Sequence, residues 1–265
     1  MKIVVPVKQV AALDDEFELL DGGSGVDPDF IELELNEWDT FSIEAALQLR
    51  EAEGGEDSEV VVITVGDEEA EEALLGCLAR GADRALRVWD ESLKDADVLT
   101  VARVLAAAVQ GESPDLVLCG VQSSDAVNGA TGVALAGYLD MPHVAVVKQL
   151  DYDPAASTAT LKRELEGGLV EVLRIRTPAL LTIQTGINEP RYANLRAIKQ
   201  AREKPLETTT PQQLGLNDES LAAAAGARRR ELRPPDRGEG AEMIDGSPAE
   251  VATRIVEIVR DRMSG

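Results

Sequence analysis

The sequence is poor in cysteine, histidine and aromatic residues, and each shortage excludes a kind of site. The 265 residues include two cysteines and one histidine, and aromatic residues make up 3%. Neither Cys77 nor Cys119 belongs to a CxxC motif, so both are expected to be small buried side chains rather than disulfide partners. The single histidine, His143, cannot build a zinc site or a serine–histidine triad by itself, and we expect a structural role for it.

The sequence also lacks long apolar runs. No run approaches the ~18 residues that a membrane-spanning helix needs. The first ten residues, MKIVVPVKQV, enter a strand-like segment directly, without the basic, apolar and small-residue regions of a signal peptide. We therefore expect a cytoplasmic protein without direct membrane insertion.

Positive charge is scarce as well. The chain has 49 acidic and 26 basic residues, a formal net charge of −23, and its seven lysines leave 19 of the basic residues as arginine. High acid content with few lysines and aromatic residues favours solubility in molar salt, where the Debye length is about 3 Å. The composition predicts a halophilic cytoplasm, and the alternative is an ordinary acidic protein. Nucleic acid is not an expected partner, because phosphate binding requires a basic surface.

Strand-like and helix-like segments alternate through much of the first 200 residues. Continuous apolar runs at 59–65 and 115–120 are typical of strands buried on both faces. This order predicts an α/β fold with a doubly wound, mainly parallel, Rossmann-like sheet, of the kind found in adenine-nucleotide α-hydrolases and universal-stress proteins. Asn36 is the expected N-cap of the first helix. The segments with helical patterns are 36–53, 68–81, 95–110 and 128–139, and residues 2–10 and 85–90 are further predicted strands.

Several segments fall outside this alternation. Residues 11–35 form an acidic excursion, and four strand-like segments joined by short turns follow residue 145. Residues 204–217 resemble a linker with proline and threonine, and a capping box at 247–250 begins a last helix. We expect a nucleotide-binding domain at 1–203, and at 204–265 a linker and C-terminal arm whose helix docks on a partner.

The segment GVQSSDAVNGATGV (120–133) is the strongest candidate site. It follows a buried strand and ends as a helix begins, and Gly120 and Gly129 allow close backbone approach. The amides of Gly129, Ala130 and Thr131 would face outward at the helix N-terminus, as in a phosphate cradle. The segment has neither a Walker A lysine nor a G-x-G-x-x-G fingerprint, so hydrolysis of a nucleoside triphosphate is disfavoured. The alternative is a glycine-rich connection that binds nothing.

Three other segments should reach the same edge of the sheet, where open α/β folds bind their ligands. They are residues 5–7, 36–39 and 65–66, and together with 120–131 they predict a pocket for an adenine nucleotide. No cysteine–histidine pair, G-x-S-x-G motif or metal-ligand cluster accompanies this pocket. We therefore expect a nucleotide-binding protein rather than an enzyme with bond-making residues of its own.

A pattern of charged, glycine and apolar residues runs through the segment 160–202 and continues upstream. Its residues are Arg163, Glu166, Gly167, Gly168, Glu171, Leu173, Pro178, Leu180, Leu181, Thr182 and Asn188 to Tyr192, with Val7, Lys8, Asn36, Glu44 to Leu47, Gly81 to Arg84, Gly120 and Gln122 before them. In these residues and their spacing the chain resembles the beta subunit of electron-transfer flavoproteins, and the match covers nearly the whole chain.

The resemblance implies a heterodimer with an alpha subunit that binds most of the FAD, while this chain closes against it. In most members the beta subunit holds AMP, and in the electron-bifurcating branch it holds a second FAD. Such heterodimers take electrons from acyl-CoA or other flavin dehydrogenases, as in fatty acid β-oxidation. They pass the electrons through a quinone-reducing oxidoreductase towards the quinone pool.

The resemblance also assigns residues. Arg163 and Glu164 match the pair that faces the flavin region of the alpha subunit. The loop SSDAVNGATG lacks the acidic cluster of AMP-binding relatives. It also lacks the Asp-Gly-Asp-Thr-Ala-Gln-like run of bifurcating relatives. AMP is the favoured nucleotide, and FAD stays the alternative. Trp38 could stack on the base or belong to the core. The residues assigned to the nucleotide are Pro6, Asn36, Glu37, Trp38, Asp39, Val65, Gly66, Gly120, Val121, Gln122, Ser123, Ser124, Asp125, Asn128, Gly129, Ala130 and Thr131.

The basic, partly apolar stretch TGINEPRYANLRAIKQA (185–201) lies within the family's partner-recognition loop, 184–202. It sums to +2 in a strongly acidic chain, and Asn194 is the expected cap of a short helix. The resemblance gives Leu195 the role of the anchor in a dehydrogenase pocket. An apolar knob within a charged rim is the form of a small transient docking site. The predicted docking residues are Tyr192, Leu195, Arg196, Ile198 and Lys199.

Two other classes of protein are alternatives. A nucleotide-binding sensor of the universal-stress type shares the sheet and the nucleotide site, but it has no use for residues 160–202 or for the C-terminal extension. A nucleotide α-hydrolase or ligase would need a pyrophosphate-binding loop of the Ser-Gly-Gly type and catalytic residues, and the sequence has neither.

Overall fold

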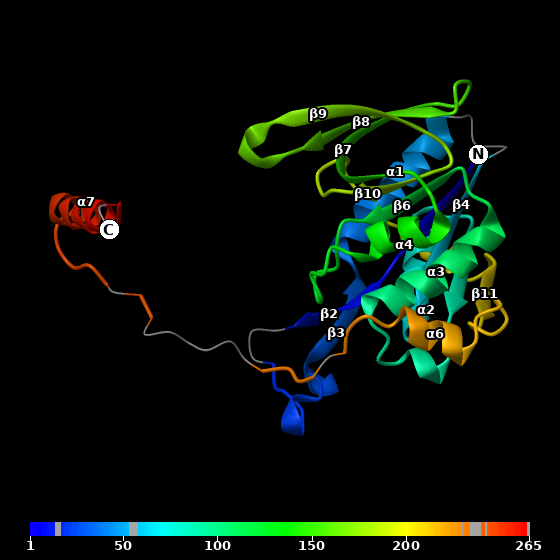
Figure 1. Cartoon of the computed structure of the whole chain (residues 1–265), viewed down its shortest axis with the longest axis horizontal. Coiled ribbons are helices and arrows are strands. Elements are labelled where there is room, and N and C mark those ends of the chain that lie inside the picture. The colour runs from blue at the N-terminus through cyan, green and yellow to red at the C-terminus, as the bar shows by residue number, and fades with distance from the viewer. Residues whose placement is uncertain (14–16, 53–57, 229, 234–239, 242, 264–265) are drawn as a thin grey trace.

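A computed structural model describes residues 1–13, 17–52, 58–228, 230–233, 240–241 and 243–263. Nine strands form one sheet in the order β11-β5-β4-β1-β6-β10-β7-β8-β9 (Figure 1). The strands from β11 to β7 pair in parallel, and β7, β8 and β9 pair antiparallel. The predicted doubly wound, mainly parallel sheet is confirmed. Its strands are β1 (Lys2–Pro6), β4 (Glu59–Val65), β5 (Arg84–Val88), β6 (Leu116–Gly120), β7 (His143–Asp153), β8 (Thr158–Glu164), β9 (Val170–Arg176), β10 (Ala179–Ile183) and β11 (Leu206–Thr209).

Helices cover both faces of the sheet, which is why the central strands are apolar along their whole length. In β1, Ile3 and Val5 belong to an apolar cluster with residues of α1 and α2, whereas Val4 belongs to a second cluster with residues of α3 and α4. The helices are α1 (Glu37–Ala52), α2 (Ala70–Arg80), α3 (Val98–Glu112), α4 (Thr131–Leu139), α5 (Leu195–Ala201), α6 (Asp218–Ala224) and α7 (Pro248–Met263), with short 3-10 turns at Asp21–Gly23, Pro28–Phe30, Glu91–Leu93 and Glu166–Gly168.

The N-terminal run does not form the single strand that was predicted for residues 2–10. After β1, the backbone N–H of Lys8 leaves the sheet and donates to the Asp39 carboxylate at 2.8 Å. The next segment, β2 (Gln9–Leu13), pairs antiparallel with β3 (Ile31–Leu35) in a separate two-stranded sheet. The excursion at 11–35 therefore includes part of a hairpin, and its residues 14–16 lie outside the described residues.

The interpretation of residues 204–217 as a linker is wrong. β11 pairs in parallel with β5 and becomes the last strand of the main sheet. The backbone N–H of Trp89 donates to the carbonyl of Thr209 at 3.0 Å, and Leu216 and Leu221 are buried. Threonine is β-branched and suits an edge strand, so the threonine run that resembles a linker forms β-structure instead.

The C-terminal arm runs along the domain before it leaves. The N–H groups of Gly226 and Ala227 both donate to one carboxylate oxygen of Asp97 at 2.7 Å. Further on, the N–H of Leu232 donates to the carbonyl of Gly23 at 2.8 Å. The last helix, α7, then lies apart from the sheet domain (Figure 1), and none of its residues is buried. The glutamate half of the capping box predicted there is present, since Ser247 N–H donates to Glu250 at 2.8 Å.

Candidate functional site

The structure brings together two of the segments that the sequence assigns to a nucleotide pocket. The loop after β6 lies against the N-terminus of α1, and the buried Asn36 side chain joins them. Its amide nitrogen donates to the carbonyl of Gln122 at 2.9 Å, and its amide oxygen accepts from Ser124 N–H at 3.2 Å. Asn36 precedes α1 as predicted, but its side chain holds the loop.

Asp39 is the buried centre of this site. Besides Lys8, the backbone N–H of Gly120 donates to its carboxylate. A side chain on Gly120 would collide with Asp39 and, at 2.8 Å, with Cβ of Trp38, so glycine is required there by close packing. Burial raises the pKa of Asp39 to about 7, although the hydrogen bonds from Lys8, Asn36 and Gly120 oppose that rise. The carboxylate thus joins α1 to the ends of β1 and β6.

Lys8 is a site residue that the sequence did not assign to the nucleotide. Its ammonium group lies 2.6 and 2.7 Å from the two carboxylate oxygens of Asp125 and 3.4 Å from the Ser123 hydroxyl. Burial alone would raise the pKa of Asp125, but Lys8 and the other hydrogen bonds hold it below its ordinary value. The available signal was position, because Lys8 lies two residues after the end of the first buried strand, at the carboxyl edge of the sheet.

The helix after the loop offers free backbone amides. α4 begins at Thr131, three residues later than predicted, and Ala130 before it gives no side-chain cap. Its first-turn N–H groups therefore have the arrangement that binds a phosphate. A Cβ on Gly132 would lie 2.6 Å from the methyl group of Thr182, which places this helix directly on β10. The uncapped first turn of α4 is the feature that fits the phosphate of a nucleotide, whereas the Lys8 ammonium group is already paired with Asp125 and holds the loop.

The other assigned residues contribute in different ways. The side chain of Pro6 is buried, so it contributes only backbone at the end of β1. Gly66 follows Val65 and packs on α2, where a Cβ would lie 2.7 Å from Cβ of Ala70. The half-buried Trp38 ring donates from Nε1 to Oε1 of Gln184 at 3.2 Å, which joins it to the start of the predicted recognition loop. Glu37 and the stretch from Ser124 to Gly129 are exposed.

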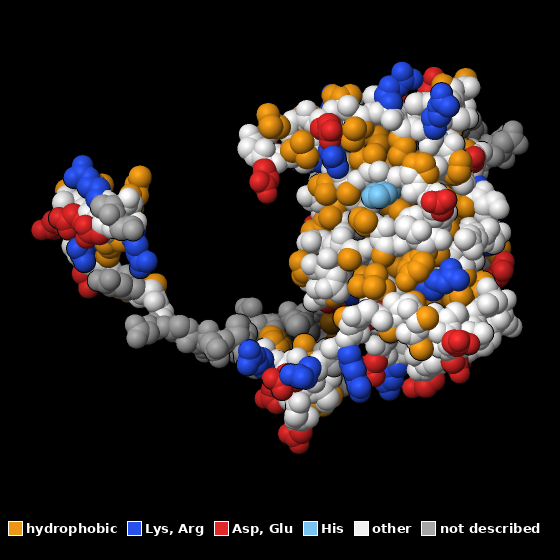
Figure 2. Space-filling model, in the orientation of Figure 1, with side chains coloured by type: hydrophobic (Ala, Val, Ile, Leu, Met, Phe, Trp, Pro, Cys, Tyr) orange, Lys and Arg blue, Asp and Glu red, His pale blue; other side chains and the backbone are white. Residues whose placement is uncertain are grey.

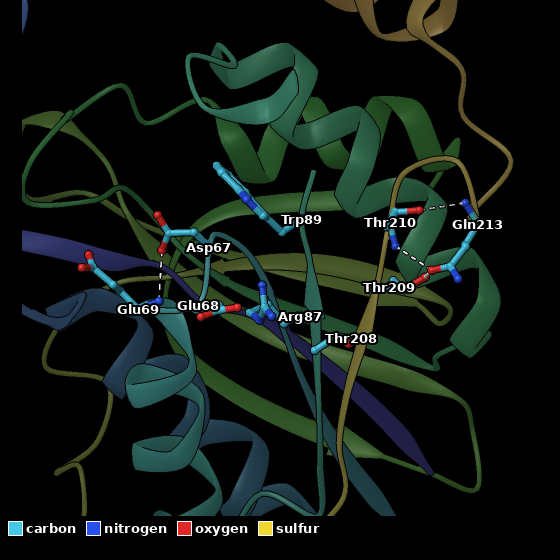
Figure 3. Close-up of a pocket in the computed structure, with 9 residues that line it drawn as sticks. All are labelled: Asp67, Glu68, Glu69, Arg87, Trp89, Thr208, Thr209, Thr210 and Gln213. Carbon is cyan, nitrogen blue, oxygen red and sulfur yellow. Dashed lines mark hydrogen bonds between the residues drawn. The ribbon is translucent and has the colours of Figure 1, made fainter. Parts of the chain in front are cut away.

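A pocket of about 650 Å³ opens further along the same edge of the sheet, beside Gly66 (Figure 3). The Arg87 guanidinium on its floor is neutralised by Glu71 at 3.0 Å, and three acids lie at its rim, so it does not suit a phosphate. Sequence reasoning missed this pocket because one wall is β11 and the turn after it, which were assigned to a linker. The lining residues are Asp67, Glu68, Glu69, Arg87, Trp89, Thr208, Thr209, Thr210 and Gln213.

The predicted recognition loop presents apolar side chains to solvent. Tyr192 is 94% exposed and Leu195 is 81% exposed. Asn194 caps α5 as predicted, with its side-chain oxygen accepting from Ala197 N–H at 2.9 Å. Arg196 and Lys199 are exposed beside Leu195, and Ile198 follows on the same helix.

A hairpin of β8 and β9 carries the predicted flavin-facing pair. Arg163 lies 2.6 Å from Glu171 of β9, and Glu164 lies 2.8 Å from Lys148 of β7. As neighbours on β8, Arg163 and Glu164 point to opposite faces of the sheet. Figure 2 shows hydrophobic side chains gathered over this hairpin and around His143. The exposed apolar residues of the hairpin are Leu165, Leu169, Val170 and Val172.

The described residues include no group of three histidine, cysteine or acidic side chains placed to hold a metal ion. Both cysteines are free and buried, and burial raises the pKa of the Cys77 thiol to about 12. No helix in the described part of the chain has the length and apolar character needed to cross a bilayer.

Residues 29–214 match the electron transfer flavoprotein domain family. The matched residues make up more than half of the chain and include β11. The electron transfer flavoprotein subunit beta of Methylophilus methylotrophus is 46% identical over 262 residues, which cover 98% of this chain and 98% of that protein. The subunit beta of Bacillus subtilis (strain 168) is 32% identical over 261 residues, again covering 98% of both. The mitochondrial subunit beta of Oryza sativa subsp. indica is 34% identical over 219 residues, 82% of this chain and 85% of that protein.

Proposed function

Because this chain belongs to the electron transfer flavoprotein family and is similar to its beta subunits along its length, we propose that it acts as the beta subunit of a heterodimeric electron carrier. The similarity to the Methylophilus methylotrophus subunit beta, which spans nearly all of both chains, carries this proposal. On this view the chain moves electrons only together with its alpha subunit, and has no bond-making residues of its own.

Two exposed apolar surfaces support an alpha-subunit partner. Strand β9 is one of the two edge strands of the sheet, and Leu169, Val170 and Val172 at that edge are each at least 60% exposed. The amphipathic helix α7 exposes Ile255, Val259 and other apolar side chains away from the sheet domain. Contiguous exposed apolar surface on a highly charged protein is typical of a binding interface. We propose that both surfaces are covered by the alpha subunit.

The nucleotide proposed for this chain is AMP, bound where the loop after β6 meets the N-termini of α1 and α4. The uncapped first turn of α4 supports a phosphate there, and the side chains of Asn36 and Lys8 hold the loop around it. A second FAD in the same pocket is the alternative, since both nucleotides carry an adenosine phosphate.

FAD held mainly by the alpha subunit would supply the electron-carrying chemistry. Arg163 and Glu164, held by Glu171 and Lys148, are the residues of this chain proposed to lie at the flavin region, one on each face of β8. Tyr192, Leu195, Arg196, Ile198 and Lys199 are proposed to dock on an acyl-CoA or other flavin dehydrogenase that donates the electrons. A quinone-reducing oxidoreductase is the proposed acceptor, and a cytoplasmic location stays a prediction.

The strongly acidic composition supports a high-salt environment as part of this proposal. At a net charge of −23, self-repulsion is screened by molar salt. Thermal unfolding in 0 to 3 M KCl tests it, with the midpoint expected to rise by ~10 °C or more. An unchanged midpoint would favour an ordinary acidic protein.

Co-expression with the alpha subunit of the same organism tests the assembly and the nucleotide together. The purified complex is denatured, and its released FAD and AMP are quantified. One FAD and one AMP per heterodimer support the simple carrier, whereas two FAD without AMP indicate the bifurcating form. A chain that forms no stable heterodimer and brings down no flavin would contradict the proposed function.

A further inference from the structure

Arg191 is the basic residue of the recognition loop that turns inward. Its Nε lies 2.8 Å from one carboxylate oxygen of Glu44, and its Nη2 donates to the other oxygen at 3.0 Å. The Arg191 backbone N–H also donates to the Glu44 carboxylate, at 3.1 Å. Glu44 lies on α1 and its side chain is buried, so this is a two-pronged pair of the geometrically specific kind.

A second carboxylate from the same helix completes the clamp. Nη1 of Arg191 lies 2.6 Å from one oxygen of Glu51, and Nη2 donates to the other at 3.1 Å. Burial alone would raise the pKa of Glu44, but Arg191 lowers it, and hydrogen bonds to Glu44 and Glu51 raise the pKa of Arg191. All three groups are therefore charged at neutral pH. We call Arg191, Glu44 and Glu51 the α1 clamp.

The α1 clamp ends where the exposed docking residues begin. Tyr192 is the next residue in the chain and Leu195 follows three residues later, both almost entirely exposed. Apolar side chains so exposed make few contacts of their own, so their position depends on how the backbone is held. Another anchor also comes from α1, because the Asn188 amide donates to the carbonyl of Phe41 at 3.0 Å.

We propose that Arg191 is a positioning residue for dehydrogenase docking: through Glu44 and Glu51 it fixes the loop so that Tyr192 and Leu195 stand ready to enter the partner. This proposal rests on the docking role assigned to Leu195 above. Arg191 itself does not contact the partner, because its guanidinium is already occupied by two carboxylates of its own chain. A preorganised loop binds better because less ordering entropy is lost on docking.

A double-mutant cycle separates this role from a merely structural one. Arg191→Ala, Leu195→Ala and the double variant are each assembled with the alpha subunit. Their KM and kcat are then measured with an acyl-CoA dehydrogenase of the same organism that reduces the wild-type heterodimer. We expect each single variant to raise KM by roughly tenfold with kcat within about twofold. If Arg191 acts by presenting Leu195, the double variant should raise KM no further than Leu195→Ala does.

Arg50→Ala is the matched control. Arg50 lies on the same helix and pairs with Asp83 at 2.7 Å instead of with a residue of the loop. It should lower the midpoint of thermal unfolding about as much as Arg191→Ala while leaving KM unchanged. Arg191→Lys, which keeps the charge but cannot make both two-pronged pairs, should fall between wild type and Arg191→Ala, and it serves as the test variant if Arg191→Ala does not assemble.

Three results would overturn the proposal: Arg191 variants with unchanged KM, a double variant whose KM increase is the product of the two single increases, or an Arg50→Ala variant with an equal increase. If Leu195→Ala alone leaves KM unchanged, the docking role itself fails, and Arg191 has nothing to position. The Leu195→Ala variant therefore distinguishes failure of the proposed function from failure of this inference.

Discussion

The side chain of Asn36, at the start of α1, donates to the carbonyl oxygen of Gln122 at 2.9 Å, across a separation of 86 residues. This bond joins the helix to the loop that follows β6. The same helix holds the predicted recognition loop through Glu44 and Arg191. One helix therefore supports both the candidate nucleotide pocket and the candidate docking surface, with its N-terminal end at the first and its later turns at the second.

Asn36→Ala should loosen the loop after β6. It removes a buried side chain that satisfies one carbonyl and one N–H of the loop, which costs about 1–3 kcal/mol of unfolding free energy. We also expect the AMP content of the purified heterodimer to fall by more than half. Asn217→Ala is the control, because Asn217 caps α6 away from the pocket and should cost about 1 kcal/mol without loss of nucleotide. Full nucleotide content in Asn36→Ala would show that the loop holds its form without this bridge.

Asp39 should make stability depend on pH. Its pKa is about 7 in the folded chain, against 3.8 for the ordinary group, because burial disfavours the charged form. The folded state therefore holds a proton between about pH 4 and pH 7 that the unfolded chain has lost. The contribution of Asp39 to the unfolding free energy is largest below pH 3.8, the ordinary pKa. It falls by about 1.4 kcal/mol per pH unit as the pH rises from there to about 7.

Urea unfolding of the wild type and of Asp39→Asn at pH 5, 6, 7 and 8 measures this dependence. The difference in unfolding free energy between the two should change from pH 5 to pH 7 and level off above that. Two curves that stay parallel over the whole range would mean that Asp39 ionises at its ordinary pKa.

Two glycines of α4 should respond in opposite ways to alanine. A Cβ at Gly132 would lie 2.6 Å from Thr182, so Gly132→Ala should cost about 1–3 kcal/mol of unfolding free energy through overpacking. A Cβ at Gly137 meets nothing within 4 Å, so Gly137→Ala should stabilise the helix by up to about 1 kcal/mol. Chemical denaturation of both variants measures the sign of the change in unfolding free energy. Equal effects at the two positions would contradict the close packing of α4 on β10.

Asp97 should hold the C-terminal arm separately from its role as a helix cap. One oxygen caps α3 through Thr100, and the other accepts from Gly226 and Ala227. Burial would raise the pKa of Asp97, but these hydrogen bonds lower it to about 2. The contribution of these hydrogen bonds to the unfolding free energy is fully present above the ordinary pKa of 3.8, and it is lost only as the pH falls towards 2.

Asp97→Asn separates these two roles, since asparagine still caps the helix but places an N–H₂ group against the arm. Hydrogen exchange of the Gly226 and Ala227 amides should become at least ~10-fold faster in Asp97→Asn, with global stability changed by less than ~1 kcal/mol. Asp97→Ala should show the same exchange and a further loss of stability from the missing cap. Unchanged exchange in both variants would mean that other contacts hold the arm.

The central strands of the sheet could be predicted because each is a continuous apolar run. Val60, Val61 and Val62 are all fully buried, and such a run is typical of a strand with helices on both faces. β11 was missed for the opposite reason. As an edge strand it carries Glu207 and threonines and has no continuous apolar run. It is a strand because it pairs with β5, and its own sequence does not show that pairing.

The site was predicted as a set of segments but not as a set of contacts. The resemblance and the strand ends brought 36–39 and 120–131 to one edge, and the structure joins them through Asn36. The pairing of Lys8 with Asp125, 117 residues apart, follows from three-dimensional proximity that no local pattern encodes. Likewise, Arg191 could be seen as one basic residue among several, and only the fold shows that it faces Glu44.

Anaerobic reduction of the assembled heterodimer tests the central claim most directly. The complex of this chain with its alpha subunit is mixed with a catalytic amount of acyl-CoA dehydrogenase and its acyl-CoA substrate, and the visible flavin absorbance of the complex is followed. The account predicts rapid bleaching that requires the dehydrogenase and that slows when Leu195→Ala is introduced. Flavin in a well-assembled heterodimer that no flavin dehydrogenase reduces would contradict the assignment of this chain as an electron-carrier subunit.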